Sequence, residues 1–352
     1  MDFTFSDDQI LFQQTTRDFL AKEVGSEKIR LGWDSPSGRS ETLWTQLAEL
    51  GLTAVTIPEH FGGLGMGVID CVLLAQEAGY AALAEPLVHN ALVAVPTLLA
   101  AESLELQNKW LPAIASGQAR VAVGLQANLL VEDAHLADLL IVQRDGCVYA
   151  VPAGAASLSL NASIDPSRRL YGIDFEPAAG LLLAEDDAAI KLVRVAQNHG
   201  ALGVAAECLG LAQRMVDMAV AYSCDRHQFG AAIGSFQAVK HLMANVAYKL
   251  EYARGPVYRA AYSLTHELGA RDMHVSHAKL AGCEAAQLAA SNSIQVHGAM
   301  GYTWEVDLHI FMKRAWVYNN AWGSAGFHKR RIAEYVFADN AALGPGNTFD
   351  LG

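Results

Sequence analysis

Hydrophobic residues recur at helical spacing over most of the chain, and the pattern changes in one central stretch. From Asp2 to about Gly117, apolar residues fall three or four positions apart, as they do along one face of a helix. Ser6, followed by two aspartates, has the form of a helix N-cap with an acidic first turn. This pattern predicts a first, helical domain over residues 1–117.

The central stretch, from about Ala119 to Arg194, consists of short apolar runs separated by turn residues. It predicts a small β domain over residues 118–194. Beyond Val195, helical spacing returns over stretches of roughly 30 residues, which indicates a bundle of long helices over residues 195–352 whose buried faces continue into an oligomer interface. The predicted fold class is mainly α with a small central β domain.

Composition supports a globular protein and excludes several classes of partner. The chain has 352 residues, of which 52% are hydrophobic and 18% charged, so it can bury a large core. Its 37 acidic and 25 basic residues give a formal charge of -12, which disfavours nucleic acid and anionic membranes as partners. The apolar run Ala91–Ala101 contains a proline and is too short to span a bilayer.

The character of the first residues and the pattern of cysteines both favour a cytoplasmic location. The first residues are acidic and polar, unlike a secretory signal. The five cysteines are scattered and lack the spacing of metal or redox motifs, which is typical of a reducing compartment. His274 and His277 lie three residues apart on a predicted helix, but no second matching motif accompanies them, so we predict no metal site.

The most specific local pattern lies between Asp225 and His241. A helix ends there, a short loop places Arg226 beside the aromatic Phe229, and a new helix begins close to Phe236. A guanidinium can bind phosphate oxygens in a bidentate manner while a ring packs on a base, so the cluster is suited to gripping a dinucleotide. The alternative is an ordinary turn between helices with a surface arginine.

A second pattern ends the following predicted helix. Gln295 is followed by Val296, His297, Gly298 and Ala299. Glycine lets the backbone approach a ligand closely, and the glutamine adds a carboxamide. The alternative is a simple helix stop.

Together the two patterns resemble the C-terminal domain of the acyl-CoA dehydrogenase family. The shared features are Arg-x-x-Phe-Gly from Arg226, a Phe-Gln pair ending at Gln237, and Gln-x-x-Gly-x-x-Gly-Tyr from Gln295. The resemblance extends over nearly the whole chain. Segments similar to the family's N-terminal and middle domains are Phe5–Gln9, Pro58–Gly65, Trp110–Gly117 and Asp165–Arg169. The last is similar to short bacterial members, many of which act on CoA thioesters of steroid side chains or rings.

The resemblance implies an N-terminal helical domain, a β-barrel-like middle domain and a C-terminal four-helix bundle. It also implies an FAD-dependent α,β-desaturation of an acyl-CoA, in which a carboxylate removes the α-proton and the β-hydrogen leaves as hydride. In the family each FAD lies between two subunits. Arg226, Phe229, Gln237 and the segment Gln295–Ala299 would therefore contact the ADP half of a neighbour's FAD.

The sequence departs from the family at the catalytic base. The usual glutamate, which precedes a glycine, is replaced by Trp322. The alternative position of the base falls on Gly200, and the arginine beside it is replaced by Ala201. Glu207, two helical turns further on, is the remaining candidate, but we expect it to face solvent or to pair locally, as helical glutamates usually do. Glu305 is expected to be structural.

The middle domain departs as well. Full-length members carry a Thr-Glu-Pro and Gly-Ser-Asp loop that contacts the flavin ring, and the few residues between Gln126 and Val131 contain neither motif. We therefore expect that this chain cannot cradle an isoalloxazine ring in its own cleft.

These departures resemble the non-catalytic subunit of α2β2 heterotetrameric acyl-CoA dehydrogenases of bacterial steroid catabolism. The resemblance implies a homologous partner that supplies the catalytic glutamate and the flavin ring contacts, and a steroid-derived or other bulky acyl-CoA as substrate. Such a heterotetramer would hold two FAD rather than four. Two alternatives stay open: a self-sufficient homo-oligomer that uses Glu207 or another carboxylate as its base, and a flavin-free scaffold.

Overall fold

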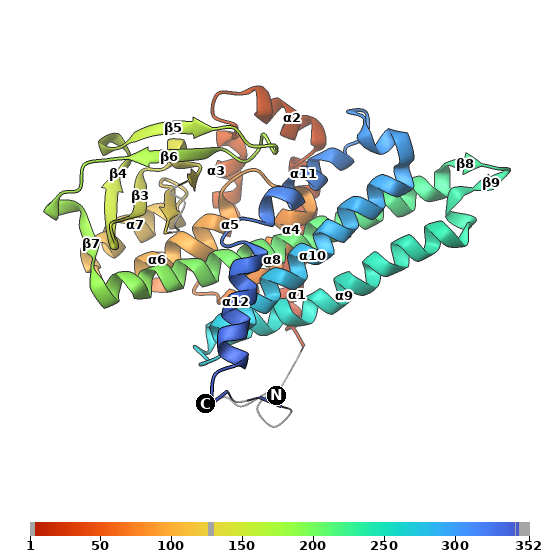
Figure 1. Cartoon of the computed structure of the whole chain (residues 1–352). Helices are drawn as coiled ribbons and strands as arrows, with labels where there is room; N and C mark the ends of the chain where they lie inside the picture. Colours follow the sequence, from red (N-terminus) through yellow and green to blue (C-terminus); the bar gives the residue numbers. More distant parts are fainter. Residues whose placement is uncertain (1–3, 126–129, 342, 345–352) are drawn as a thin grey trace. The chain divides into compact units, whose positions relative to one another are not determined.

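The computed structural model describes residues 4–125, 130–341 and 343–344, and these are mainly helical, with two small sheets and a hairpin (Figure 1). The predicted fold class is confirmed. Its internal contacts divide the chain into two compact units. The first unit comprises residues up to 21, residues 72–83 and the chain from Val204 onward, and the second unit comprises residues 22–71 and 84–203. The division into three domains, at 117/118 and 194/195, stays a prediction.

The first unit is a helical bundle. Its helices are α1 (Asp7–Glu23), α4 (Val68–Ala81), α9 (Gln237–Thr265), α10 (Arg271–His297), α11 (Leu308–Tyr318) and α12 (Ala325–Val336). The 40-residue helix α8 (Asp186–Asp225) begins in the second unit and ends in the first. Figure 1 shows α9 and α10 running side by side after the short turn that joins them.

The start of α1 confirms the predicted N-cap. The backbone N–H of Gln9 donates to Ser6 Oγ at 3.2 Å, and the Gln9 side chain accepts from the backbone N–H of Ser6 at 2.9 Å. Each side chain thereby satisfies a backbone donor that the first turn of a helix leaves without a partner.

Helices α4 and α8 meet backbone to backbone. A Cβ atom at Gly79 would lie 2.0 Å from the carbonyl oxygen of Glu207, and one at Gly210 would lie 1.9 Å from that of Gln76. No side chain fits at these distances, so glycine is what allows the two helices to pack this closely.

The second unit contains shorter helices and both small sheets. Its helices are α2 (Ser26–Asp34), α3 (Glu41–Glu49), α5 (Leu87–His89), α6 (Val95–Ala100) and α7 (Leu104–Ala115), with a π-helical stretch at Asn90–Ala94. One sheet has the order β1-β3-β4-β7, in which β1 and β3 are parallel and the other pairs antiparallel. Its strands are β1 (Val121–Gly124), β3 (Leu139–Arg144), β4 (Cys147–Pro152) and β7 (Leu182–Ala184).

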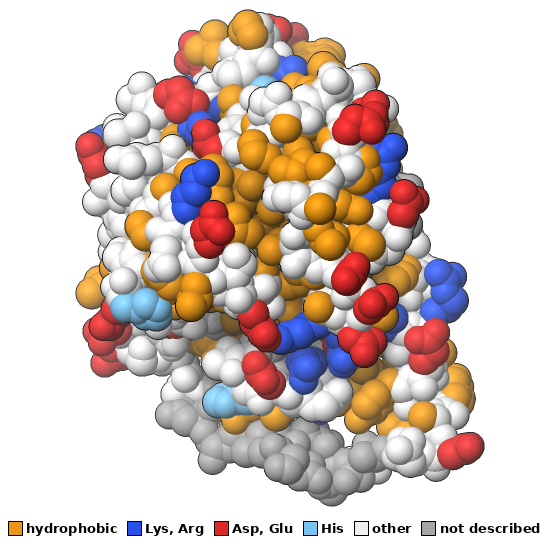
Figure 2. Space-filling model, turned by 90° about the vertical axis from the view of Figure 1, so that its left-hand side faces the viewer, with side chains coloured by type: hydrophobic (Ala, Val, Ile, Leu, Met, Phe, Trp, Pro, Cys, Tyr) orange, Lys and Arg blue, Asp and Glu red, His pale blue; other side chains and the backbone are white. Residues whose placement is uncertain are grey.

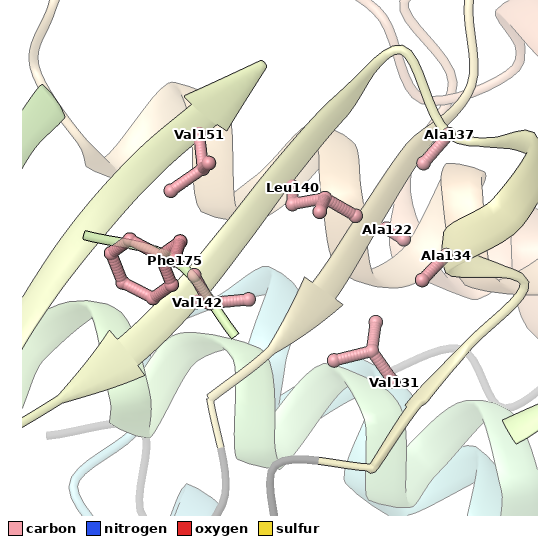
Figure 3. Packing of buried hydrophobic residues seen from close by; sticks show 8 residues of the cluster. All are labelled: Ala122, Val131, Ala134, Ala137, Leu140, Val142, Val151 and Phe175. Carbon is pink, nitrogen blue, oxygen red and sulfur yellow. The ribbon is translucent and has the colours of Figure 1, made fainter. Parts of the chain in front are cut away.

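The other sheet is antiparallel and has the order β2-β6-β5. Its strands are β2 (Leu130–Glu132), β6 (Leu170–Asp174) and β5 (Ser157–Asn161). A small apolar core joins the strands and includes Val131, Leu140 and Phe175 (Figure 3). Figure 2 looks onto this strand-bearing side and shows hydrophobic side chains gathered in the middle of the face.

The segment Asp165–Arg169 forms hydrogen bonds to the end of α2 and the loop that follows it, in the second unit. Ser167 Oγ accepts a hydrogen bond from the Trp33 indole at 2.7 Å, and Arg169 Nη2 donates to the carbonyl oxygens of Trp33 and Ser35 at 3.0 Å each. The next residues of the loop are held by Arg39, which forms a buried ion pair with Asp133 at 2.6 Å. This segment therefore has a structural role.

Candidate functional site

A short hairpin joins α8 to α9 and extends beyond the ends of both helices (Figure 1). Strand β8 (His227–Gln228) pairs with β9 (Ala231–Ala232), and the turn residues Phe229 and Gly230 have φ angles of +54° and +79°. Glycine adopts this region freely, whereas phenylalanine rarely does. The Phe229 side chain is 94% exposed, so the turn presents an uncovered ring.

Arg226 and Gln237 stand on either side of this hairpin, and both are exposed. The carbonyl oxygen of Arg226 accepts from the backbone N–H of Ile233 at 2.8 Å, which closes the base of the hairpin. Gln237 is the first residue of α9, as the predicted helix start near Phe236 implied. Neither side chain forms a hydrogen bond or ion pair with any residue that the structure describes.

The segment Gln295–Ala299 covers the end of α10 and the start of the following turn. Gln295, Gly298 and Ala299 are exposed, whereas the side chains of Val296 and His297 are buried. What this segment offers to a ligand is therefore the Gln295 carboxamide and the backbone around Gly298, which has a φ angle of +59°.

His297 connects the two predicted patterns. Its ring stacks on Tyr222 with the centroids 4.3 Å apart, and its Nδ1 donates to the carbonyl oxygen of Ser293 at 2.8 Å. The main-chain carbonyl oxygen of Tyr222 in turn accepts a hydrogen bond from the backbone N–H of Arg226 at 2.9 Å. The tertiary structure thus brings the arginine hairpin and the end of α10 to the same end of the bundle.

These outward groups fit the ADP half of a dinucleotide. The Arg226 guanidinium retains all of its donors for phosphate oxygens, Phe229 offers a ring face for stacking, and Gln237 and Gln295 add carboxamides. Residues 126–129, where the flavin-ring loop is expected to be missing, lie outside the described residues.

Trp322 occupies the position that the resemblance assigns to the base. Its side chain is 8% exposed, its φ angle is +53°, and its carbonyl oxygen accepts from His328 Nε2 at 3.0 Å. Lys279 Nζ donates to the carbonyl oxygen of Tyr318 at 3.0 Å and lies 3.5 Å from that of Gly323. The indole of Trp322 is buried, and an indole has no lone pair with which to accept a proton.

Glu207 corrects one expectation, because it does not face solvent. It is 8% exposed, and its Oε1 accepts the hydroxyl of Tyr318, which lies 111 residues away, at 2.9 Å. The physical reason is that α8 is buried on all sides from Ala201 to Ala212, so this stretch of the helix has no solvent-facing side. Gly200 and Ala201 are buried as well.

Sequence reasoning missed Lys279, the largest fully buried side chain in the described part of the chain. The available signal was a lone cation among small apolar residues on the inner face of a predicted helix. Burying such a group is costly unless it has strong hydrogen-bond partners, which here are main-chain carbonyl oxygens.

His274, one of the two histidines considered as metal ligands, has another partner in the structure. His274 is buried and bonded to Ser263 Oγ at 2.7 Å, and burial lowers its pKa to about 4. Among the residues that the structure describes, no group of three His, Cys, Asp or Glu is placed to hold a metal ion. Nor does any described helix combine the length and the apolar character needed to cross a bilayer.

Comparison with known proteins identifies the family. Residues 6–118 match the acyl-CoA dehydrogenase N-terminal domain and residues 190–337 the acyl-CoA dehydrogenase C-terminal domain. The acyl-CoA dehydrogenase IpdE2 of Mycobacterium tuberculosis is 33% identical over 306 residues, which are 87% of this chain and 90% of that protein.

Two solved structures share the fold. The ChsE4-ChsE5 complex from Mycobacterium tuberculosis has a TM-score of 0.87 at 23% identity and covers 98% of this chain and 100% of that one. The Tcur3481-Tcur3483 steroid ACAD G363A variant has a TM-score of 0.81 at 22% identity, with 93% and 97% covered. The two family domains and the 33% identity to IpdE2 lead to one conclusion: the chain belongs to the acyl-CoA dehydrogenase family, the oxidoreductases that act on the CH–CH bond of acyl-CoA thioesters.

Proposed function

We propose that this chain is the subunit of a heteromeric acyl-CoA dehydrogenase that lacks the catalytic base. Its C-terminal bundle contributes to an active site that a homologous partner completes. Acyl-CoA dehydrogenases are flavoproteins and generally bind FAD. In this proposal FAD, held at its ADP half by this chain, would supply the hydride-accepting chemistry, and a glutamate of the partner would remove the α-proton.

The observation that carries the proposal is the buried Trp322 at the position of the base. General-base catalysis needs a group that accepts a proton within hydrogen-bond reach of the substrate, and an indole cannot do so. Gly200 and Ala201, at the alternative position, also lack acceptors in their side chains. Glu207 is already engaged by the Tyr318 hydroxyl, so no observation favours it as a substitute.

The role left to this chain is to hold the ADP half of FAD. The Arg226 guanidinium would bind the diphosphate, Phe229 would cover the adenine, and the carboxamides of Gln237 and Gln295 would hydrogen-bond the remaining polar groups. Support comes from their exposure and from the stack of His297 on Tyr222, which keeps the two segments together.

The solved relatives support a heteromeric assembly and a bulky substrate. The ChsE4-ChsE5 structure is that of a complex of two different chains, and the Tcur3481-Tcur3483 protein is described as a steroid ACAD. We extend both features to this chain: an α2β2 heterotetramer, acting on a steroid-derived or other bulky acyl-CoA.

Co-expression tests the assembly. We expect the chain alone to be colourless or inactive, and the complex with a homologous, glutamate-bearing acyl-CoA dehydrogenase chain to be yellow and to reduce an electron acceptor in the presence of an acyl-CoA. A yellow, active homo-oligomer of the single chain would overturn the proposal. A colourless but stable complex would instead indicate a scaffold.

Substitution of Arg226 tests the cofactor role. Arg226→Ala removes a charge-assisted contact worth about 1.5–3 kcal/mol, so we expect FAD affinity in the complex to fall by roughly tenfold to a hundredfold while assembly stays intact. Arg330→Ala, at another exposed arginine, is the matched control and should leave FAD binding unchanged. Equal FAD occupancy in the two variants would contradict the role.

A further inference from the structure

Two thiols from distant parts of the sequence touch inside the helical bundle. Cys208 on α8 and Cys283 on α10 are 0% and 4% exposed, and their sulfur atoms lie 3.8 Å apart. The function proposed above uses neither of them. Their separation is that of two thiols in contact, and the other buried cysteine, Cys71, has no thiol neighbour among the described residues.

The backbones of α8 and α10 come unusually close at the same level. A Cβ atom at Gly282, the residue before Cys283, would lie 2.7 Å from the carbonyl oxygen of Ala205 and 3.2 Å from its Cα. A disulfide requires the two Cα atoms to lie within about 7 Å. Close contact of the two helices one residue from Cys283 and one helical turn from Cys208 favours this geometry.

The surroundings distinguish the two thiols. Lys279, one helical turn before Cys283, is buried, and its charge acts on the Cys283 thiol. Hydrogen bonding from the Cys208 thiol, together with the charge of Lys279, lowers the pKa of Cys283. The same hydrogen bond, together with burial, raises the pKa of Cys208. Cys283 is therefore the better nucleophile of the two.

We propose that Cys208 and Cys283 form a reversible dithiol–disulfide site, oxidised by peroxides. The sulfur of Cys283 attacks one peroxide oxygen, the O–O bond breaks, and a sulfenic acid forms with release of water or an alcohol. The sulfur of Cys208 then attacks the sulfenic sulfur, the S–S bond forms, and the hydroxyl leaves as water. The two thiols lose two electrons, which reduce the peroxide, and a low-molecular-weight thiol restores the pair.

Closing this bridge has two structural consequences. It joins residues 75 positions apart, so it restricts the unfolded chain and stabilises the folded one. It also removes the thiol hydrogen of Cys283, whose sulfur lies 3.7 Å from the carbonyl oxygen of Tyr318. That carbonyl keeps its hydrogen bond from Lys279, so the segment leading to Trp322 stays held.

The test treats the purified full chain, in its native assembly, with hydrogen peroxide and maps disulfide-linked peptides by mass spectrometry. We expect a peptide of α8 joined to one of α10 through these two cysteines, with the loss of two hydrogen atoms. The melting temperature should rise by several degrees and return to its starting value with dithiothreitol.

The control variant Cys208→Ala should show neither the linked peptide nor the rise in melting temperature. Replacing the remaining cysteines together, as Cys71→Ala, Cys147→Ser and Cys224→Ser, should leave both effects intact, and the mapping of the unmodified chain does not depend on whether that variant folds. Thiols that stay reduced in the folded protein, oxidation to sulfinic acid without a bridge, or a bridge through Cys224 would each overturn the proposal. None of these readouts depends on flavin or on the partner's glutamate.

Discussion

Single residues around Trp322 form a buried polar network. Lys279 and His328 donate to the carbonyl oxygens of Tyr318 and Trp322, and the Tyr318 hydroxyl donates to Glu207. Buried polar groups are costly unless they are paired, and here each one has a partner. The segment that bears the replaced base is therefore rigidly held, which suits a structural role.

Glu207→Gln separates a structural glutamate from a catalytic one. The amide oxygen of glutamine can still accept the Tyr318 hydroxyl, so the free energy of unfolding should change by no more than about 1 kcal/mol. The dehydrogenase rate of the heteromeric complex should stay the same, because in the proposed assembly the partner supplies the base. A loss of about a hundredfold or more, typical of removing a general base, would show that Glu207 takes the proton.

His328 makes stability depend on pH. It is fully buried, and burial, helped by the charge of Lys279, lowers its pKa to about 3 from an unfolded value of about 6.5. Between these two values the unfolded chain binds a proton that the folded chain does not, so stability falls as the pH drops. This single group should contribute a slope of up to about 1.4 kcal/mol per pH unit.

The measurement compares urea unfolding near pH 7 and near pH 5 for the natural chain and for His328→Gln. The slope contributed by one proton should disappear in the variant, while glutamine still donates to Trp322 and accepts from Ser276. His241→Gln, at an exposed histidine, should leave the slope as it is. Equal slopes in all three proteins would refute the assignment.

At the level of elements, the close contact of α4 with α8 depends on glycine. The carbonyl oxygen of Gln76 occupies the place where a Cβ atom of residue 210 would stand. Both contact partners are helical backbone, which cannot move aside without shifting a whole helix. This explains why glycine, a poor helix former, occurs inside α8 at Gly210 and in the last turn of α4 at Gly79.

Gly210→Ala should therefore cost roughly 1–3 kcal/mol or more in the free energy of unfolding, as overpacking of a core does. Gly326→Ala is the matched control, because a Cβ atom there would meet nothing closer than 3.8 Å on an exposed face of α12. It should be neutral or stabilise by up to about 1 kcal/mol. Chemical denaturation measures both, and equal stability of the two variants would disprove the close packing.

For the whole molecule, the proposal fixes the cofactor stoichiometry. Because this chain offers contacts to the ADP half of FAD and lacks the base of its own site, each pair of unlike chains should hold one FAD. Released flavin absorbance, measured against the native mass of the complex, should show two FAD in an α2β2 heterotetramer. One FAD per chain would mean that this subunit cradles a flavin ring after all.

The fold and the motifs were readable from the sequence, whereas several side-chain environments were not. Helical spacing and short apolar runs broken by turn residues predicted the fold class. The N-cap at Ser6 and the helix start near Phe236 depend on local chemistry alone. Glu207 was placed wrongly because the spacing of one helix cannot reveal that neighbours cover all its sides. Cytoplasmic location and the two boundaries between the three predicted domains stay predictions.

By itself, then, the sequence determined the family and the helical fold, and it led to the proposal that the catalytic carboxylate is lost, because each depends on residue identity or on short-range periodicity. Only the tertiary structure decided which distant groups meet: His297 with Tyr222, Glu207 with Tyr318, Lys279 with the end of α11, and Cys208 with Cys283. Such pairs lie tens of residues apart, and their contacts are set by helix packing that no local pattern encodes.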